Sequence, residues 1–160
     1  MVYRFVIQNN TKMRNDVSFK EALVDTIRYY GDDTSRRSLC FFMHEDGRRC
    51  AIGRYIRPEK EGFFQEMDRL HNSNIEAAVH AYQKMTFVSG RTLTENDAIR
   101  ELLHITDATI SDLMLLEILH DEDNNWDENG LSEFGKETVK HFRSDLVEVV
   151  HTSLEDGIIA

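Results

Sequence analysis

Four arginines lie close together in the first half of the chain, at Arg48, Arg49, Arg54 and Arg57, with Tyr55 among them. The planar guanidinium group forms paired hydrogen bonds with phosphate, and a tyrosine ring can stack on a base. The segment therefore predicts a binding site for a small anionic, nucleotide-like ligand. The alternative interpretation is an ordinary solvated strand whose arginines pair with nearby Asp and Glu side chains.

His120 and Asp121 form a second candidate group, and Trp126, the only tryptophan, follows them closely. In the ligand-binding hypothesis, His120 and Asp121 contact the ribose or the base edges. Trp126 then forms an aromatic wall of the pocket, and a core position for Trp126 is the alternative. These residues and the arginine segment together make up the predicted ligand site.

The adjacent pair His120-Asp121 also resembles the doublet of the metal-dependent HD phosphohydrolases. In those enzymes the doublet binds a metal together with a histidine upstream and an aspartate downstream. His80 or His104 would be the upstream ligand, and Asp145 the downstream one. The alternative is that Asp121 caps a loop and that His120 interacts favourably with the C-terminus of a helix.

The acidic segment after the doublet follows the first half of an EF-hand calcium loop, with Asn125, Asp127, Asn129 and Gly130 at the required spacing. The twelfth loop position normally holds a bidentate glutamate, and here it is Lys136. Because that glutamate supplies two of the calcium ligands, the pattern favours a surface turn rich in Asx caps over a calcium site.

Three common catalytic or phosphate-binding motifs are absent from the sequence. It has no glycine-rich phosphate loop, no nucleophile elbow and no CxxC pair. The arginines near Cys50 could lower the pKa of its thiol, but a single cysteine without a positioned histidine is typical of a small buried residue. We therefore predict no catalytic residue, no metal and no cofactor, and favour a non-enzymatic protein.

Charge is distributed unevenly along the chain. The net charge of −10 divides into +4 for residues 1–60 and −14 for residues 61–160, which argues against nonspecific nucleic-acid binding. Acidic helix faces that serve only solubility would explain the difference. The other interpretation is an acidic surface that inhibits a partner by covering a basic cleft, such as the DNA channel of a nuclease. The residues expected to carry it are Glu122, Asp123, Asp127 and Glu128.

A length of 160 residues fits one domain, with a frayed tail expected at 152–160. The N-terminus lacks the pattern of a signal peptide, and no apolar run approaches the roughly 20 residues of a membrane helix. A cytoplasmic protein is expected. The two cysteines, Cys40 and Cys50, imply no disulfide framework.

The expected fold class is α+β, with a small antiparallel sheet packed against a mainly helical C-terminal part. The sheet would consist of a strand at 2–7 and a hairpin over 38–56. Asp46-Gly47 is typical of a two-residue type I′ turn, which would pair Met43 with Cys50. In that register Cys40 and Cys50 point to opposite sheet faces, so no disulfide between them is expected.

Capping signals predict the helices. Ser18 and Glu21 form a capping box for a helix over 18–30, which Gly31 would end. Further helices are expected over 58–70, 75–85, 94–103, 111–119 and 132–149. The one over 111–119 is apolar nearly all round and should be the buried central helix. The last should bury a stripe made of Phe134, Thr138, Phe142, Leu146 and Val149.

Five short motifs stand out over residues 18–142: Cys50-Ala51-Ile52-Gly53-Arg54-Tyr55, Leu119-His120-Asp121, Trp126, Gly130-Leu131-Ser132 and Gly135. Together they resemble a family of small uncharacterised proteins from bacteriophages and bacteria. The resemblance implies a phage or mobile-element origin and carries no established activity. It suggests a role in phage–host conflict, in which the protein masks a host defence protein or sequesters a nucleotide signal. An oligomer would help to enclose such a ligand.

Overall fold

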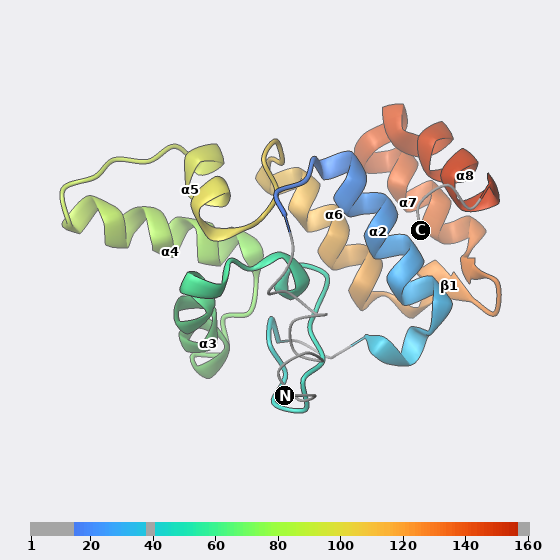
Figure 1. Ribbon diagram of the computed structural model, residues 1–160. Helices are drawn as coiled ribbons and strands as arrows, with labels where there is room; N and C mark the ends of the chain where they lie inside the picture. The colour runs from blue at the N-terminus through green and yellow to red at the C-terminus, as the bar shows by residue number, and fades with distance from the viewer. Residues whose placement is uncertain (1–14, 38–40, 157–160) are drawn as a thin grey trace.

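The computed structural model describes residues 15–37 and 41–156, which form a mainly helical protein with a small two-stranded antiparallel sheet (Figure 1). The predicted α+β class is confirmed. The strand expected at 2–7 and Cys40 lie outside the described residues, and Cys50 is a free cysteine. In the part of the chain that the structure describes, no helix is long and apolar enough to cross a membrane.

Helix α2 spans Phe19–Asp32 and begins with the predicted capping box. The Ser18 hydroxyl accepts a hydrogen bond from the Glu21 amide, and the Glu21 carboxylate accepts one from the Ser18 amide. Gly31 was expected to end this helix, but it lies within the last turn. A Cβ at Gly31 would lie 3.5 Å from the Cα of Gly130, an ordinary van der Waals distance, so this end of α2 packs directly against the segment that holds Gly130.

The predicted hairpin over 38–56 is only partly present. In its described portion Met43 forms an antiparallel bridge with Arg49, not with Cys50. The predicted type I′ turn is wrong, because Gly47 alone in the turn has a positive φ and the amide of His44 bonds to the carbonyl of Arg48. The loop therefore contains one residue more than expected, which shifts the register.

The prediction of a second strand after the hairpin turn is also wrong, because residues 53–55 form the 3-10 helix η3 (Gly53–Tyr55). A strand would bury alternate side chains, whereas every residue from Cys50 to Ile56 is buried. A tight turn can bury consecutive residues. The Cys50 carbonyl accepts the Arg54 amide, and the Cys50 sulfur accepts the Gly53 amide.

The middle of the chain is helical, as predicted. It contains η4 (Pro58–Lys60), α3 (Glu61–Arg69), α4 (Ile75–Val88) and α5 (Glu95–Leu102). Asn74 and Thr94 cap α4 and α5 through their side chains. Pro58 occupies the first helical position, as expected. Helices α4 and α5 form an arm that extends from the rest of the molecule (Figure 1).

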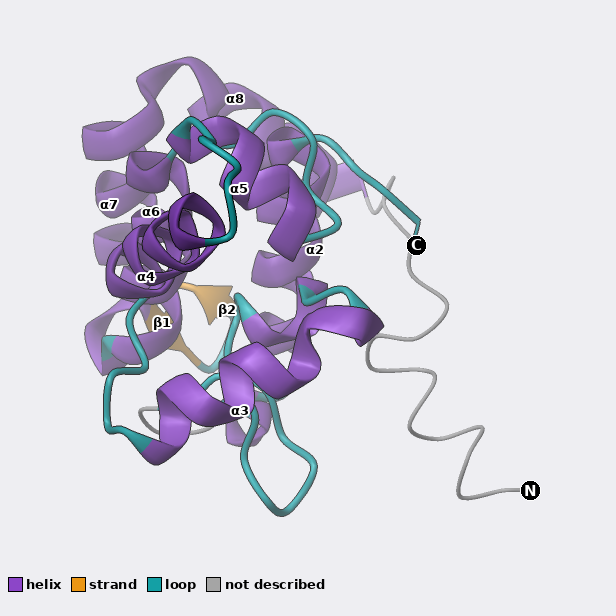
Figure 2. Ribbon diagram, turned by 90° about the vertical axis from the view of Figure 1, so that its left-hand side faces the viewer, coloured by secondary structure: helices purple, strands orange, loops and turns teal. Residues whose placement is uncertain are grey.

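Helix α6 (Ile110–Asp121) is the central helix that the sequence predicted. A capping box of Thr109 and Asp112 starts it. It contacts α2, α4, α5 and α7 and buries its leucines at 113, 115, 116 and 119 completely. Figure 2 shows the two short strands, in orange, among the helices.

The acidic segment after α6 is more ordered than the loop we expected. It consists of η5 (Asp123–Asn125), β1 (Trp126–Asp127) and β2 (Gly130–Leu131), with Trp126 paired to Leu131. Ser132 then caps α7 (Glu133–Arg143), as predicted.

The last helix is not continuous to Val149. It breaks at Arg143, and η6 (Ser144–Leu146) and α8 (Val147–Asp156) follow. The buried positions are Gly135, Val139, Leu146 and Val150, one residue later than most of the predicted stripe, whereas Phe134 is exposed. A Cβ on Gly135 would lie 2.6 Å from the Asn125 carbonyl, so this side of α7 must face inward. Residues 152–156, expected to be frayed, continue α8.

Candidate functional site

The four arginines of the predicted ligand site do not converge on a pocket. Each forms an ion pair with a carboxylate from a different part of the chain, in the pairs Arg48–Asp46, Arg49–Glu61, Arg54–Asp25 and Arg57–Asp16. The partners belong to the hairpin turn, to α3, to α2 and to the segment before α2. The structure thus agrees with the alternative interpretation, in which the arginines pair with nearby acidic residues, and it corrects the expectation of a shared anion site.

Arg54 and Tyr55 are structural residues. Arg54 is only 5% exposed, and its guanidinium carbon lies 3.7 Å from the centroid of the Tyr29 ring. Tyr55 is fully buried and donates its hydroxyl to Asp25 at 2.5 Å. The expectation that Tyr55 stacks on a base is therefore wrong, because no face of its ring reaches the surface.

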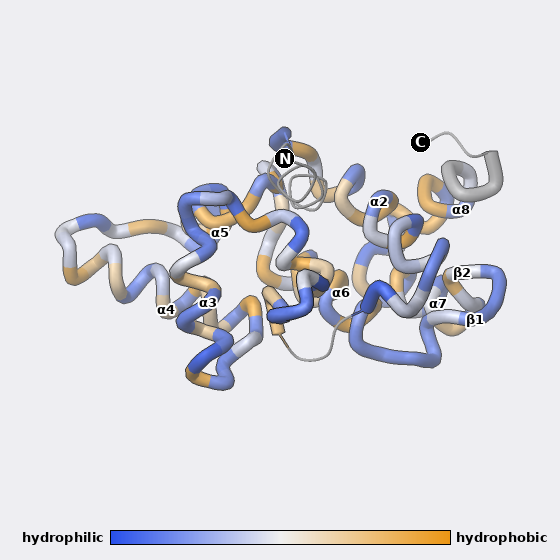
Figure 3. The backbone as a smooth tube through the Cα atoms, turned by 60° about the horizontal axis from the view of Figure 1, so that its bottom comes forward, coloured by the Kyte–Doolittle hydropathy of each residue, from blue (hydrophilic) through white to orange (hydrophobic). Residues whose placement is uncertain are grey.

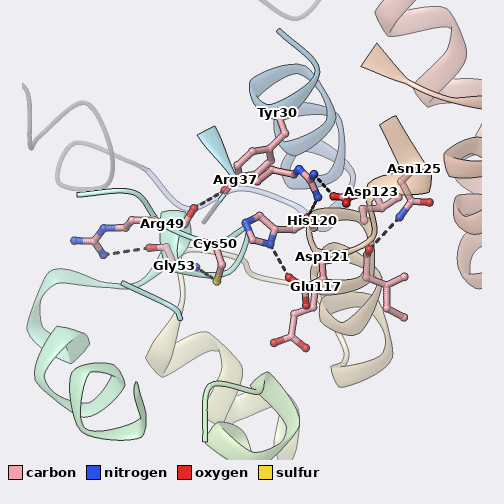
Figure 4. A network of polar contacts seen from close by, with 12 residues as sticks. Tyr30, Arg37, Arg49, Cys50, Gly53, Glu117, His120, Asp121, Asp123 and Asn125 are labelled. Carbon is pink, nitrogen blue, oxygen red and sulfur yellow. Dashed lines mark hydrogen bonds and ion pairs between the residues drawn. The ribbon is translucent and has the colours of Figure 1, made fainter. Parts of the chain in front are cut away.

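His120 and Trp126 are also core residues. His120 is 1% exposed, and its Nδ1 lies 2.7 Å from an oxygen of Asp121 (Figure 4). Trp126 is buried, and its indole N–H donates to the Leu119 carbonyl at 2.7 Å. The core alternative for Trp126 is confirmed. Among His120, Asp121 and Trp126 only Asp121 is exposed, so these three residues cannot together surround a ligand.

The indole hydrogen bond gives a testable role to Trp126. Replacing Trp126 with phenylalanine is expected to destabilise the protein by roughly 1–3 kcal/mol, because the Leu119 carbonyl loses its donor and some volume is left empty. Urea unfolding followed by circular dichroism measures the loss. Phe134→Leu, a change at an exposed aromatic residue of α7, is the control and should have little effect. Equal stability of the two variants would contradict this role.

The ligands of the HD-type metal site lie apart. His80 pairs with Glu95, His104 pairs with Asp16, and Asp145 pairs with Arg143. Within residues 15–37 and 41–156, no three His, Cys, Asp or Glu side chains gather as metal ligands. The acidic segment forms an Asx turn, in which Asp127 accepts the amide of Asn129, and Lys136 pairs with Glu133. This is the surface turn favoured over an EF-hand.

A cluster of polar side chains lies between α6 and Cys50. Cys50, Glu117, His120 and Asp121 line a small cavity of about 20 Å³, which is room for about one water molecule. Burial raises the pKa of the Cys50 thiol to about 12. The thiol therefore stays protonated at neutral pH and is no nucleophile. This corrects the idea that neighbouring arginines lower its pKa.

Glu117 is the member of this cluster that the sequence analysis missed. Burial, together with the negative charges of Asp121 and Glu76, raises its pKa to about 7. One of its oxygens accepts the amide of Ile75 at the N-terminus of α4, at 2.9 Å. A carboxylate in the otherwise apolar run of α6, one turn before His120 and Asp121, was the available signal.

The exposed acidic residues are held on a well-anchored segment. We call residues 122–131 the acidic hairpin; its exposed carboxylates are Glu122, Asp123, Asp127 and Glu128. The turn between its strands is hydrophilic, in blue in Figure 3. Asp123 pairs with Arg37. In the part of the chain that the structure describes, Glu122, Asp127 and Glu128 have no ion-pair partner.

Buried groups fix this hairpin to the body. The fully buried Asn125 donates to the Ile118 carbonyl at 3.0 Å and accepts from the Thr138 hydroxyl at 3.1 Å. Trp126 adds its bond to Leu119, and Gly130 packs against Gly31. The carboxylates therefore extend from a rigid support, which lowers the entropy that binding would otherwise cost.

No protein-family model matches this chain, and the searches of curated proteins and of solved structures found no significant match. The resemblance to small phage proteins therefore stays a prediction. The chemistry of the described residues is what bears on function: neutralised arginines, a protonated buried thiol, and an exposed rigid acidic hairpin.

Proposed function

We propose that this is a non-enzymatic binding protein that covers a basic cleft of a partner protein with its acidic hairpin. The observation that supports this best is the presence of exposed carboxylates without counter-charges on a segment anchored by buried Asn125 and Trp126. The setting we propose is phage–host conflict in the host cytoplasm. The partner would be a defence protein or a nuclease whose nucleic-acid channel is lined by Lys and Arg.

The charge of the molecule supports such a role. Residues 61–160 carry a net charge of −14, and a field of one sign steers a basic partner and speeds association. Rigid carboxylates also fix the orientation of the partner. The hairpin is polar at its tip and thus suits the wet, charged surface of a nucleic-acid channel.

Capture of a nucleotide-like ligand by the arginine segment is the weaker hypothesis. A phosphate would have to displace carboxylates from Arg49, Arg54 and Arg57, and each of these ion pairs is partly buried. Removing one partner from a buried pair leaves an uncompensated charge. No described aromatic residue at that segment is free to stack on a base.

Charge reversal on the hairpin tests the proposed function. The variant Glu122→Lys, Asp127→Asn and Glu128→Lys changes the net charge by +5 and keeps the Asx turn and the Arg37–Asp123 pair. The immobilised protein is exposed to bacterial lysate, and bound proteins are eluted with increasing salt. We expect a basic partner that is retained by the wild type and lost by the variant, with association slowed roughly tenfold or more.

A matched control separates the position of the charges from their number. Glu45→Lys, Glu59→Lys and Glu148→Gln also change the net charge by +5, at exposed sites outside the hairpin. The control should hold the partner, and added DNA should compete with both it and the wild type. Retention of every bound protein by the hairpin variant would refute the proposal.

A further inference from the structure

Within the arm formed by α4 and α5, most of α4 and the loop after it have an unusual composition. Residues 77–94 contain no Asp or Glu, although the chain has 29 of them, and they do contain Lys84 and Arg91. Two copies of a protein with net charge −10 repel one another in most orientations. Residues 77–94 are therefore where a second copy can approach with the least repulsion.

The same arm exposes large apolar side chains. Met85, Phe87 and Val88 are 48%, 67% and 81% exposed. A surface groove beside them is lined by His80, Ala81, Lys84, Met85, Val88 and Ser89. Large apolar side chains that are exposed at a protein surface mark candidate sites of association.

The outer stripe of α4 is self-complementary in size. Ala77, Ala81, Lys84 and Val88 recur at helical spacing. Lys84 and Val88 are exposed, whereas Ala77 and Ala81 are partly buried and also contact the core. Small residues occupy the N-terminal half of the stripe and long or branched ones the C-terminal half. When two such helices pack antiparallel, the large half of each meets the small half of the other.

The direction of α4 supports the same arrangement. A two-fold axis between residues 82 and 83 places Val88 of each copy at the level of Ala77 of the other, and Lys84 at the level of Ala81. An antiparallel arrangement also places the positive end of each helix dipole beside the negative end of its partner.

We propose that the outer face of α4 packs antiparallel against the same face of a second copy, giving a two-fold symmetric dimer. The interface is isologous, so it closes at two copies. The acidic hairpin lies at the opposite end of the molecule from the α4–α5 arm (Figure 1). The dimer therefore leaves both hairpins accessible, and this inference does not depend on the proposed function.

The mass of the full chain in solution tests the dimer. Light scattering after size exclusion, over a wide concentration range, should give the mass of two chains. Val88→Asp should raise the dissociation constant roughly a hundredfold, without changing the fold, because that side chain is largely exposed. Thermal unfolding of the variant confirms its folding. The hairpin variant with Glu122→Lys, Asp127→Asn and Glu128→Lys should dimerise like the wild type.

Disulfide cross-linking tests the register. In a Cys40→Ser background, Ala81→Cys near the two-fold axis should cross-link on oxidation, whereas Gln65→Cys on the exposed side of α3 should not.

Three results would overturn the proposal. The first is a single-chain mass at every concentration, and the second is a dimer that Val88→Asp leaves intact. The third is a monomer that sediments with lipid vesicles through Phe87 and Val88, which would assign the arm to a membrane surface.

Discussion

Replacing Gly53 with alanine is expected to destabilise the protein by roughly 3–5 kcal/mol, near the upper end of single substitutions. A Cβ at this position would lie 1.9 Å from the carbonyl oxygen of Phe42 and 3.2 Å from the Cβ of Arg49. The obstacle is backbone and cannot rotate away. That backbone is itself held, because the Asp68 carboxylate accepts the amides of Phe42 and Met43 at 2.9 and 3.0 Å.

Equilibrium unfolding in urea measures this effect, and Gly62→Ala is the matched control. Gly62 lies in α3, has an ordinary φ, and a Cβ there would meet nothing within 4 Å. The control should therefore gain about 0.5–1 kcal/mol from the higher helix propensity of alanine. If both variants changed stability in the same direction by similar amounts, the close packing of Gly53 on Phe42 would be wrong.

Glu117→Gln is expected to have the second large effect, and that effect depends on pH. The pKa of Glu117 is raised from 4.5 to about 7, first by burial and then by the charges of Asp121 and Glu76. Between these pH values the folded protein binds more protons than the unfolded chain, so stability falls as the pH rises through this range. Glutamine does not ionise and can still accept the Ile75 amide.

The variant should thus be more stable than the wild type above pH 7, by up to about 3 kcal/mol, and the advantage should disappear near pH 4.5. Urea unfolding at pH 5 and pH 8 gives the difference. Glu148→Gln, at an exposed position of α8, should not reproduce it. A wild type whose stability does not fall between pH 5 and 8 relative to Glu117→Gln would show that Glu117 is ionised without penalty.

The two surfaces proposed for binding have different physical origins. The acidic hairpin is a charged, rigid segment, whereas residues 77–94 carry exposed apolar side chains and no acidic residue. A dimer through α4 would present two hairpins at once. Binding of a partner with two basic sites would then gain from the effective concentration of the second hairpin.

Sequence patterns predicted the helices and most of their starting points. Ser18, Thr94 and Ser132 cap their helices as predicted, because a capping hydrogen bond joins residues only three apart. The central position of α6 also follows from its sequence, since a helix apolar on all sides must be surrounded by others. These features depend on neighbours along the chain, which a pattern in the sequence records.

The roles of the candidate residues depend on contacts between distant parts of the chain. Arg54 meets Asp25 and Arg57 meets Asp16 across long stretches of chain, and these contacts convert a predicted anion site into ion pairs. The burial of Tyr55 and Trp126 has the same cause. Burial and charge pairing depend on which distant segments meet, and the spacing of residues along the sequence does not indicate which segments these are.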